Sequence, residues 1–448
     1  MVKWFFPAGL WRAAFWTRAG LGLVTAAWLC MPSWEQAQSG LFSHNKKHAP
    51  QAEAKPAFTS SQPPAFEIPV GPLGFFAPGA IYQGQRDSLA SLDFLDENRL
   101  LFTFHAPGLM RRNDKGDDSL RQIRAVVLTL PQGTITAEAL WTLHDRGRYV
   151  WMLNDGHFVL RDQNDLQLGD RTLELKPKFH FRGPILWLEI DPTQQWLVTD
   201  SREIAESKRS VNDVPSPASA LATITSDAPE AADNPDIILR ILRRTTGQVM
   251  LMSHVRSTVH LPVNNEGYLE TLRGKGREWV LNLNYFTGGS RIIGKIDSVC
   301  SPSLEFVSQN EVLVTTCNPD GSHWLVGMAI DGRHLWNAAS PRTEIWPRLV
   351  MAPDGLRLAR ESLLVTHPVD ALSPLSFDDV KGQLVEVYDA ADGRLALKAQ
   401  ASPVLDGGGN VAISPSGKRV AIVNGGAIQV YELPLPAALP LEAKPAVH

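Results

Sequence analysis

The sequence predicts an all-β protein, and three observations lead to this prediction. Gly and Pro are abundant, with 34 and 32 residues in a chain of 448, which favours short strands joined by turns over long helices. β-Branched and aromatic residues alternate with polar residues in short runs. These runs come in pairs around tight turns such as Asn154-Asp155-Gly156, which is the pattern of a β-hairpin.

The hairpins recur along the chain. Seven copies can be distinguished, of which the copy at Val259 is the faintest. They begin at Ser91, Tyr149, Ile185, Val259, Ser303, Arg348 and Asn410. The spacing is about 53 residues per copy, near the period of propeller blades. Several copies carry a second hairpin, as in residues 125–141, so we predict a single β-propeller with seven blades of four antiparallel strands.

A propeller leaves open strand edges unless its first and last blades join. The last copy contains one hairpin and a third strand at residues 427–432, after which the chain turns to Pro and Ala. The fourth strand of this blade must then come from the N-terminal side. We expect it in residues 74–82, shortly before the first copy.

Three segments outside the repeats lack the pattern of a folded domain. Residues 40–69 are predicted to be a flexible Pro- and Ala-rich tether, and residues 201–236 a disordered insertion. Residues 435–448 are predicted to be a flexible tail. The propeller is therefore expected to span residues 70–434.

Residues 1–39 have the pattern of a signal peptide. Lys3, Arg12 and Arg18 precede an apolar run over residues 19–31, which has the length of a secretory h-region and is too short to span a bilayer. Ala37-Gln38-Ser39 supplies a small-x-small cleavage pattern. We expect an extracytoplasmic protein, periplasmic or secreted. A retained N-terminal anchor is the alternative, and only then would the protein contact a membrane.

Cys300 and Cys317 are the two cysteines of the expected mature chain, and they flank a hairpin that turns at residues 308–310. Facing residues of an antiparallel hairpin have numbers with a constant sum, which places these two cysteines opposite each other to within one residue. Because an exported protein meets an oxidant, we predict a Cys300–Cys317 disulfide. Two buried free thiols are the alternative.

The predicted connections between second and third strands are long in three copies, at residues 105–122, 201–236 and 367–381. In a propeller these connections emerge on one face, and insertions gathered on one face commonly mark a binding surface. Drift is the alternative, since long surface insertions cost little stability. We expect a protein or small-molecule partner at this face.

Motifs for specific chemistry are absent. The sequence has no phosphate-binding loop, no nucleophile elbow and no His-Glu-x-x-His zinc motif, and its 12 His are scattered. We therefore expect no cofactor and no metal, and we name no catalytic residue. A formal net charge of −4 argues against nucleic acid as a partner.

Two turns resemble a known repeat signature. Residues 352–355 (APDG) and 414–421 (SPSGKRVA) resemble the SPDGKxLA signature of WD-repeat-like, YVTN-type bacterial β-propellers, and residues 389–395 are similar to their DxxTGK turn. The resemblance implies the fold and not an activity, because such propellers serve as binding platforms, lactonases and cofactor enzymes. The segment that ends at Trp336 resembles the docking motif of quinoprotein propellers, but it occurs once. Packing of Trp336 between blades is the simpler interpretation.

The sequence therefore favours an exported monomer that acts as a binding or scaffolding module of the bacterial cell envelope or surface, without naming the ligand. A propeller enzyme, either a lactonase-like hydrolase or a degenerate quinoprotein, is the alternative.

Overall fold

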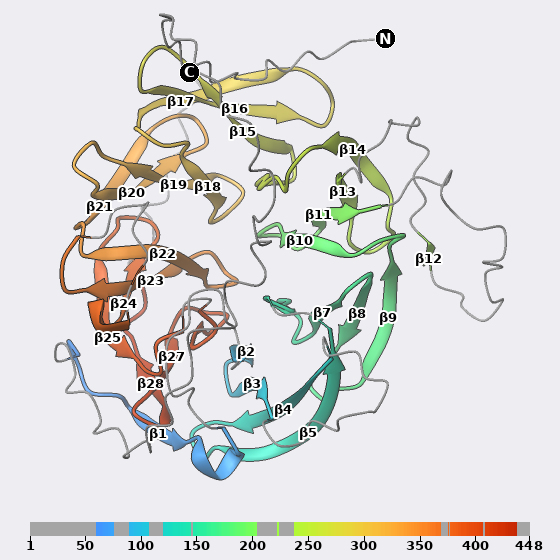
Figure 1. The fold of residues 1–448 in the computed structure, drawn as a ribbon, viewed down its shortest axis with the longest axis vertical. Coiled ribbons are helices and arrows are strands. Elements are labelled where there is room, and N and C mark those ends of the chain that lie inside the picture. Colours follow the sequence, from blue (N-terminus) through green and yellow to red (C-terminus); the bar gives the residue numbers. More distant parts are fainter. Residues whose placement is uncertain are drawn as a thin grey trace, which may run out of the picture. The chain divides into compact units, whose positions relative to one another are not determined.

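Seven sheets of mostly antiparallel strands are arranged as the blades of a β-propeller (Figure 1). The computed structural model describes residues 60–75, 89–106, 120–144, 147–203, 222–223, 237–368, 375, 377–405 and 408–436. All of them belong to one unit, Pro56–His448. These residues contain no α-helix, and none of their helices is long and apolar enough to cross a membrane. The predicted all-β class and the seven-bladed propeller are confirmed.

The first three blades follow the order of the chain. Blade 1 contains β2 (Ser91–Asp96), β3 (Arg99–His105), β4 (Arg121–Thr129) and β5 (Thr134–Leu143). Blade 2 contains β6 (Val150–Met152), β7 (Phe158–Asp162), β8 (Asp165–Gly169) and β9 (Leu175–His180), with β12 (Ala222–Thr223) added in parallel to β9. Blade 3 contains β10 (Ile185–Ile190), β11 (Trp196–Arg202), β13 (Ile237–Arg243) and β14 (Val249–Val255).

The remaining blades continue around the ring. Blade 4 contains β15 (Gly267–Arg273), β16 (Glu278–Tyr285) and β17 (Ser290–Asp297). Blade 5 contains β18 (Ser303–Phe306), β19 (Glu311–Cys317), β20 (His323–Ala329) and β21 (His334–Ser340). Blade 6 contains β22 (Glu344–Met351), β23 (Arg357–Val365), β24 (Val380–Asp389) and β25 (Leu395–Ala401). Blade 7 contains β26 (Val411–Ile413), β27 (Arg419–Asn424), β28 (Ala427–Glu432) and β1 (Phe66–Pro69).

Blade 4 departs from the four-stranded pattern. Its innermost segment forms an isolated bridge between Val263 and Tyr268. Two hydrogen bonds flank the bridge, from the Leu269 amide to the Pro262 carbonyl and from the Asn264 amide to the Gly267 carbonyl. Pro262 has no N–H to donate, so a regular inner ladder cannot form through this position. This is also the copy whose sequence pattern is faintest.

The strand that closes the ring differs from the predicted one. Strand β1 pairs with β28, whereas the prediction gave this role to residues 74–82. Residues 71–73 form a short 3-10 helix and Gly74 has a left-handed φ of +85°, so the chain leaves the sheet before reaching that segment. Residues 76–82 lie outside the described part. The propeller thus begins inside the segment predicted to be a tether, because Ile68 is buried in the apolar cluster that includes Ile428 and Val430 of blade 7.

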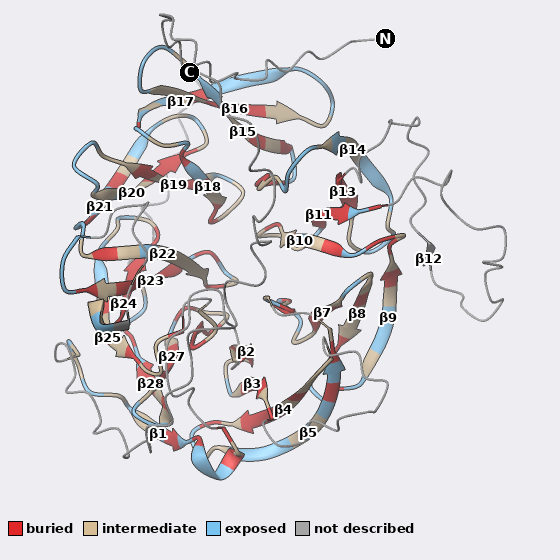
Figure 2. Ribbon diagram, in the orientation of Figure 1, coloured by how far each residue is buried: buried red, intermediate tan, exposed pale blue. Residues whose placement is uncertain are grey.

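Burial follows the position of a strand within its blade (Figure 2). In blade 3 the middle strand β13 is buried over almost its whole length, while the outer strand β14 is mostly accessible. The apolar clusters join neighbouring blades. One of them contains Phe102 of blade 1 and Val430 of blade 7. The core therefore lies between blades, and the innermost strands are left to line the axis.

The turns that carry the repeat signature lie between the first and second strands of their blades, as predicted. APDG at 352–355 joins the first two strands of blade 6, and SPSG at 414–417 joins the first two strands of blade 7. In each turn the glycine has a positive φ, +74° at Gly355 and +67° at Gly417, and donates its N–H to the carbonyl three residues earlier. Positive φ at these positions explains why the signature requires glycine.

Candidate functional site

The two faces of the propeller differ in their connections. Because consecutive strands of a blade are antiparallel, first-to-second and third-to-fourth turns lie on one face, here called the turn face. Second-to-third connections and the links between blades lie on the opposite loop face. The long connections β3–β4, β11–β13 and β23–β24 all belong to the loop face, as the repeat pattern predicts. Most of their residues lie outside the described part.

Charged side chains from four blades meet at the axis, and we call them the central cluster. Its members are Asp93 of β2, Arg148 shortly before β6, Glu305 of β18, Arg348 of β22 and Glu361 of β23. Arg148 of blade 2 interacts electrostatically with Glu305 of blade 5 and Glu361 of blade 6. Blade 2 is a neighbour of neither blade 5 nor blade 6, so side chains of these blades can approach Arg148 only at the axis. Arg148 and Asp93 place the cluster toward the loop face, where β2 and β6 begin.

The surrounding blades desolvate the carboxyl groups of the cluster. Burial raises the pKa of Asp93 to about 6, and that of Glu305 and of Glu361 to about 7, even though Arg148 and Arg348 pull in the opposite direction. Burial also lowers the pKa of Arg148 to about 10. Asp93, Glu305 and Arg348 nevertheless keep part of their surface accessible, and Arg148 keeps more. Both observations fit side chains that touch water along the axis while protein encloses them laterally.

Much of the hydrogen-bonding capacity in the cluster is unused. Glu361 is 2% exposed; its Oε2 accepts a hydrogen bond from Gln383 Nε2 at 3.1 Å, while its Oε1 has no partner in the described residues. Arg148 donates Nε to the Val150 carbonyl at 3.1 Å. Within the described part of the chain, the side chains of Arg348 and Glu305 form no hydrogen bond. An unpaired buried carboxylate oxygen is costly, so its retention points to a function.

Gly408, in the link between blades 6 and 7, lies against two members of the cluster, Arg348 and Glu361. A Cβ on Gly408 would lie 2.7 Å from Arg348 Nη1 and 2.9 Å from Glu361 Oε2. The guanidinium and the carboxylate therefore lie side by side on one wall, although they form no ion pair. Gly408 also has a φ of +65°, so both its backbone and its surroundings favour glycine.

A second polar group adjoins the cluster. His260 Nδ1 and Glu189 Oε2 lie 2.9 Å apart as an ion pair rather than an aligned hydrogen bond, and His260 Nε2 lies 2.6 Å from the Leu304 carbonyl. Desolvation would lower the pKa of His260, but Glu189 outweighs it and raises the pKa to about 9. The Trp187 ring meets the His260 ring edge-on at 5.8 Å. The ion pair and the contact with the Leu304 carbonyl hold His260 beside the strand that carries Glu305.

A cavity of about 410 Å³ opens on the turn face between blades 7, 1 and 2. Its lining residues are Leu95, Asp96, Glu97, Asn154, Asp155, Gly156, His157, Asp170, Arg171 and Pro415. Its acidic groups are engaged locally: Glu97 accepts from the Ser416 amide at 2.6 Å, and Asp170 accepts from Thr172, which lowers the pKa of Asp170. Because these carboxylates already have turn partners, the central cluster is the stronger candidate site.

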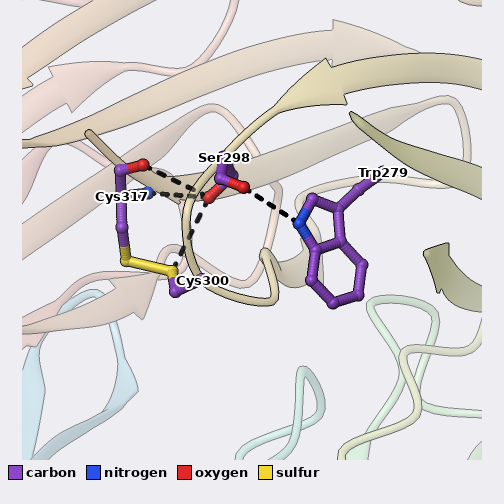
Figure 3. The surroundings of a disulfide bond; sticks show 4 residues. All are labelled: Trp279, Ser298, Cys300 and Cys317. Carbon is purple, nitrogen blue, oxygen red and sulfur yellow. Dashed lines mark hydrogen bonds between the residues drawn. A yellow bond between two sulfur atoms is a disulfide. The ribbon is translucent and has the colours of Figure 1, made fainter. Parts of the chain in front are cut away.

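The two cysteines predicted to pair are bonded in the structure (Figure 3). Their Cα atoms lie 5.6 Å apart, and β18 pairs with β19 in the register Ser303 opposite Thr315, as the turn at 308–310 requires. Ser298 Oγ accepts from the Cys317 amide at 3.0 Å, and the Ser298 carbonyl accepts from Trp279 Nε1 at 3.1 Å. The disulfide is thus tied to blade 4 and braces the boundary between blades 4 and 5.

Trp336 has a packing role. Its side chain is buried, its Nε1 donates to the Ala390 carbonyl at 2.6 Å, and its ring stacks on Tyr388 of blade 6. These contacts join blades 5 and 6, in agreement with the interpretation that Trp336 packs between blades. Among the described residues, no group of three or more His, Cys, Asp or Glu is arranged to hold a metal ion.

No residue of the central cluster was predicted as a site residue, yet the sequence contains a signal for it. The first strands of blades 1 and 5 read Ser-Leu-Asp-Phe and Ser-Leu-Glu-Phe, which places Asp93 and Glu305 at equivalent positions between two buried apolar residues. Glu189 follows Leu188 in the first strand of blade 3 in the same way. An acid that recurs inside the innermost strand of a repeat indicates a polar axis. Comparison of the copies position by position would have found it.

No protein-family model and no curated protein matches the chain. Solved structures with a similar fold include an acylaminoacyl peptidase from Pyrococcus horikoshii, which is 9% identical over 77% of this chain and 52% of that chain, with a TM-score of 0.41. TolB from Acinetobacter baumannii is 14% identical over 68% of this chain and 71% of that chain, with a TM-score of 0.34.

Sqt1 from Chaetomium thermophilum is 12% identical over 78% of this chain and 97% of that chain, with a TM-score of 0.40. This chain spans about half the length of the acylaminoacyl peptidase. At these identities and scores the comparisons carry no information about activity, so the function must be argued from the site.

Proposed function

We propose that the protein is an exported binding module of the bacterial cell envelope or surface, of the WD-repeat-like, YVTN-type kind, and that the central cluster is its ligand site. The observation that carries the proposal is the gathering of charged groups from blades 1, 2, 5 and 6 at the axis; among the described residues, those of blades 2, 5 and 6 leave hydrogen-bonding capacity unused, while Asp93 of blade 1 accepts from Ser91. Propellers present ligands and partners with such axial sites because every blade contributes one inner strand.

Without a ligand, the buried part of the central cluster is energetically unfavourable. Taking a charged group out of water is unfavourable unless partners replace its hydration. Glu361 is buried and its Oε1 has no partner in the described residues, so the fold does not recover that cost for this carboxyl group. The Arg348 guanidinium, which is partly exposed, forms no hydrogen bond there and is available to a ligand. A ligand that bonds to these groups would recover it, which is the expected signature of a binding site.

Export is supported by the sequence and by the cysteine pair. The basic lead and the apolar run favour a signal peptide, although residues 1–39 lie outside the described part. The bonded Cys300 and Cys317 fit an oxidising compartment, since cytosolic thiols are kept reduced.

Fractionation tests the export. The full chain is expressed in a bacterium, and the N-terminus of the protein is sequenced from each fraction. We expect a mature chain that begins near Gly40 outside the cytoplasm. Recovery of an intact Met1 terminus only from the soluble cytoplasmic fraction would contradict export.

Ligand screening tests the site. Thermal midpoints are measured for the purified chain and for the double variant Arg348→Met/Glu361→Gln, with a panel of amino acids, peptides, sugars, nucleotides and organic acids. We expect at least one class to raise the midpoint of the wild type and to lose that effect in the variant. If every stabilising compound acts equally on both proteins, the central cluster is not the site.

A propeller hydrolase of the lactonase-like kind is the second candidate, and one observation favours it. Glu305 and Glu361 have pKa values raised to about 7, near the value that suits a general acid or base at neutral pH. Assays with lactones and esters separate the two functions. Turnover that falls at least about tenfold in Glu361→Gln, with a pH profile that shifts, would favour the enzyme. The same residual rate in both proteins would favour binding.

A further inference from the structure

Among the described residues, the central cluster leaves groups of both charges without a partner. In that part of the chain Arg348 has no hydrogen-bond acceptor for its guanidinium, and Arg148 uses only Nε. Of the acidic groups, the Glu305 carboxylate and Glu361 Oε1 have no hydrogen-bond donor among the described residues. A ligand that is only an anion would leave the carboxylates unpaired, and a ligand that is only a cation would leave the guanidiniums unpaired.

The arrangement also limits the separation of the ligand's charges. Arg348 Nη1 and Glu361 Oε2 lie within 3 Å of one point beside Gly408, so a positive and a negative wall group are adjacent. A ligand that pairs with both must carry its own opposite charges close together. An α-carboxylate and an α-ammonium on one carbon, or at the two ends of a dipeptide, meet this condition.

The charge balance of the cluster agrees with a ligand of zero net charge. Two guanidiniums face three carboxyl groups, and burial raises the pKa values of those carboxyl groups to about 6 for Asp93 and about 7 for Glu305 and Glu361. Near pH 7 the carboxyl groups are therefore only partly ionised, and their charge roughly balances the two arginines. A singly charged ligand would upset this balance in a desolvated site.

We propose that the central cluster binds a small zwitterion, either a free α-amino acid or a short peptide with free termini. This inference rests on the proposed function. The carboxylate of the ligand lies between Arg148 and Arg348, where guanidinium forks suit it. Its ammonium group donates to Glu305 and to Oε1 of Glu361. The position of Gln383, which holds the other oxygen of Glu361, leaves Oε1 free to accept.

Three matched probes test the charge requirement by calorimetric titration of the purified chain. Glycylglycine carries both charges, N-acetylglycine carries only the carboxylate, and glycinamide carries only the ammonium group. We expect glycylglycine to bind at least about tenfold more tightly than either of the others, since each missing charge leaves the arginines or the carboxyl groups of the cluster without a ligand partner.

Substitutions in the cluster test which side chain binds each charged group of the ligand. Arg348→Met is expected to remove the advantage of the carboxylate, and Glu361→Gln to remove that of the ammonium group. Glu305→Gln is a second test of the ammonium side if Glu361→Gln does not fold. Lys295→Met and Glu278→Gln remove an exposed ion pair on the outside of blade 4 and should leave the affinity unchanged. Circular dichroism verifies that each variant is folded.

The possible outcomes separate the ligand class from the function. Equal affinities for glycylglycine and N-acetylglycine would overturn the zwitterion and indicate an anion site. Absence of binding by all three probes would also overturn it. The wider ligand panel then decides the proposed function on its own, because that screen does not depend on the class of the ligand.

Discussion

Ile68 of β1 lies opposite Ile428 of β28, 360 positions later in the chain, and this pairing closes the propeller. Both side chains are buried in the apolar cluster that joins blades 7 and 1. Strand β1 has only four residues, so its attachment depends on a few contacts.

Ile68→Ala should therefore destabilise the whole ring. Truncation of a buried isoleucine typically costs about 2–5 kcal/mol of the free energy of unfolding. The matched control is Glu67→Ala on the exposed side of the same strand, for which we expect a change within about 0.5 kcal/mol. Denaturant unfolding measures both. Equal effects of the two substitutions would show that β1 does not close the ring in solution.

Thiol titration should find the cysteines of a chain that begins at Gly40 fully oxidised. Such a chain contains Cys300 and Cys317 but not Cys30, so after unfolding without a reductant we expect no thiol that reacts with a maleimide, and two after reduction. Two reactive thiols before reduction would refute the bridge. The double variant Cys300→Ser/Cys317→Ser should lose roughly 3 kcal/mol, since the bond closes a loop with a sequence separation of 17.

Glu361→Gln should change how stability depends on pH. Burial raises the pKa of Glu361 from 4.5 to about 7, so the folded protein retains this proton at pH values where the unfolded chain has released it. The resulting stabilisation is complete below about pH 4.5 and is lost as the pH rises through about 7. Asp93 and Glu305, with Arg148 and Arg348 beside them, titrate in the same region.

The variant removes the contribution of Glu361 alone. Above pH 7 it should be more stable than the wild type by an amount on the order of 3 kcal/mol, and the difference should vanish as the pH falls below about 4.5. Denaturant unfolding at several pH values measures this. Parallel pH profiles for the two proteins would contradict the burial of an ionisable Glu361.

Gly408→Ala should separate the effect of backbone strain from that of the site. Gly408 has a φ of +65° and Gly425 has a φ of +56°, so alanine at either position costs about 1–2 kcal/mol. Nothing lies within 4 Å of a Cβ at Gly425, whereas a Cβ at Gly408 would meet Arg348 and Glu361. Only Gly408→Ala should weaken the binding of glycylglycine. Equal weakening by both variants would show that the effect does not arise at the cluster.

Local chemistry made much of the fold predictable. Hairpins depend on residues that are close in sequence and on the turn between them. Gly355 and Gly417 therefore indicate their turns in the sequence. In the same way, the turn at 308–310 fixes which residues of β18 and β19 face each other. The same logic brought Cys300 and Cys317 together. Even the irregular inner segment of blade 4 was visible as a faint copy, because Pro262 interrupts the ladder.

Long-range packing decided the rest. The sequence required a closing strand, but the choice of β1 over residues 74–82 depended on the apolar site that Ile68 fills in blade 7. The central cluster depended on closure as well. Asp93 and Glu305 occupy equivalent positions in their copies, yet they meet Arg148 and Glu361 only because seven blades complete a ring. Turns and the hairpins that they join involve residues that are close in sequence, whereas the pairing of β1 with β28 and the axis require the closed ring.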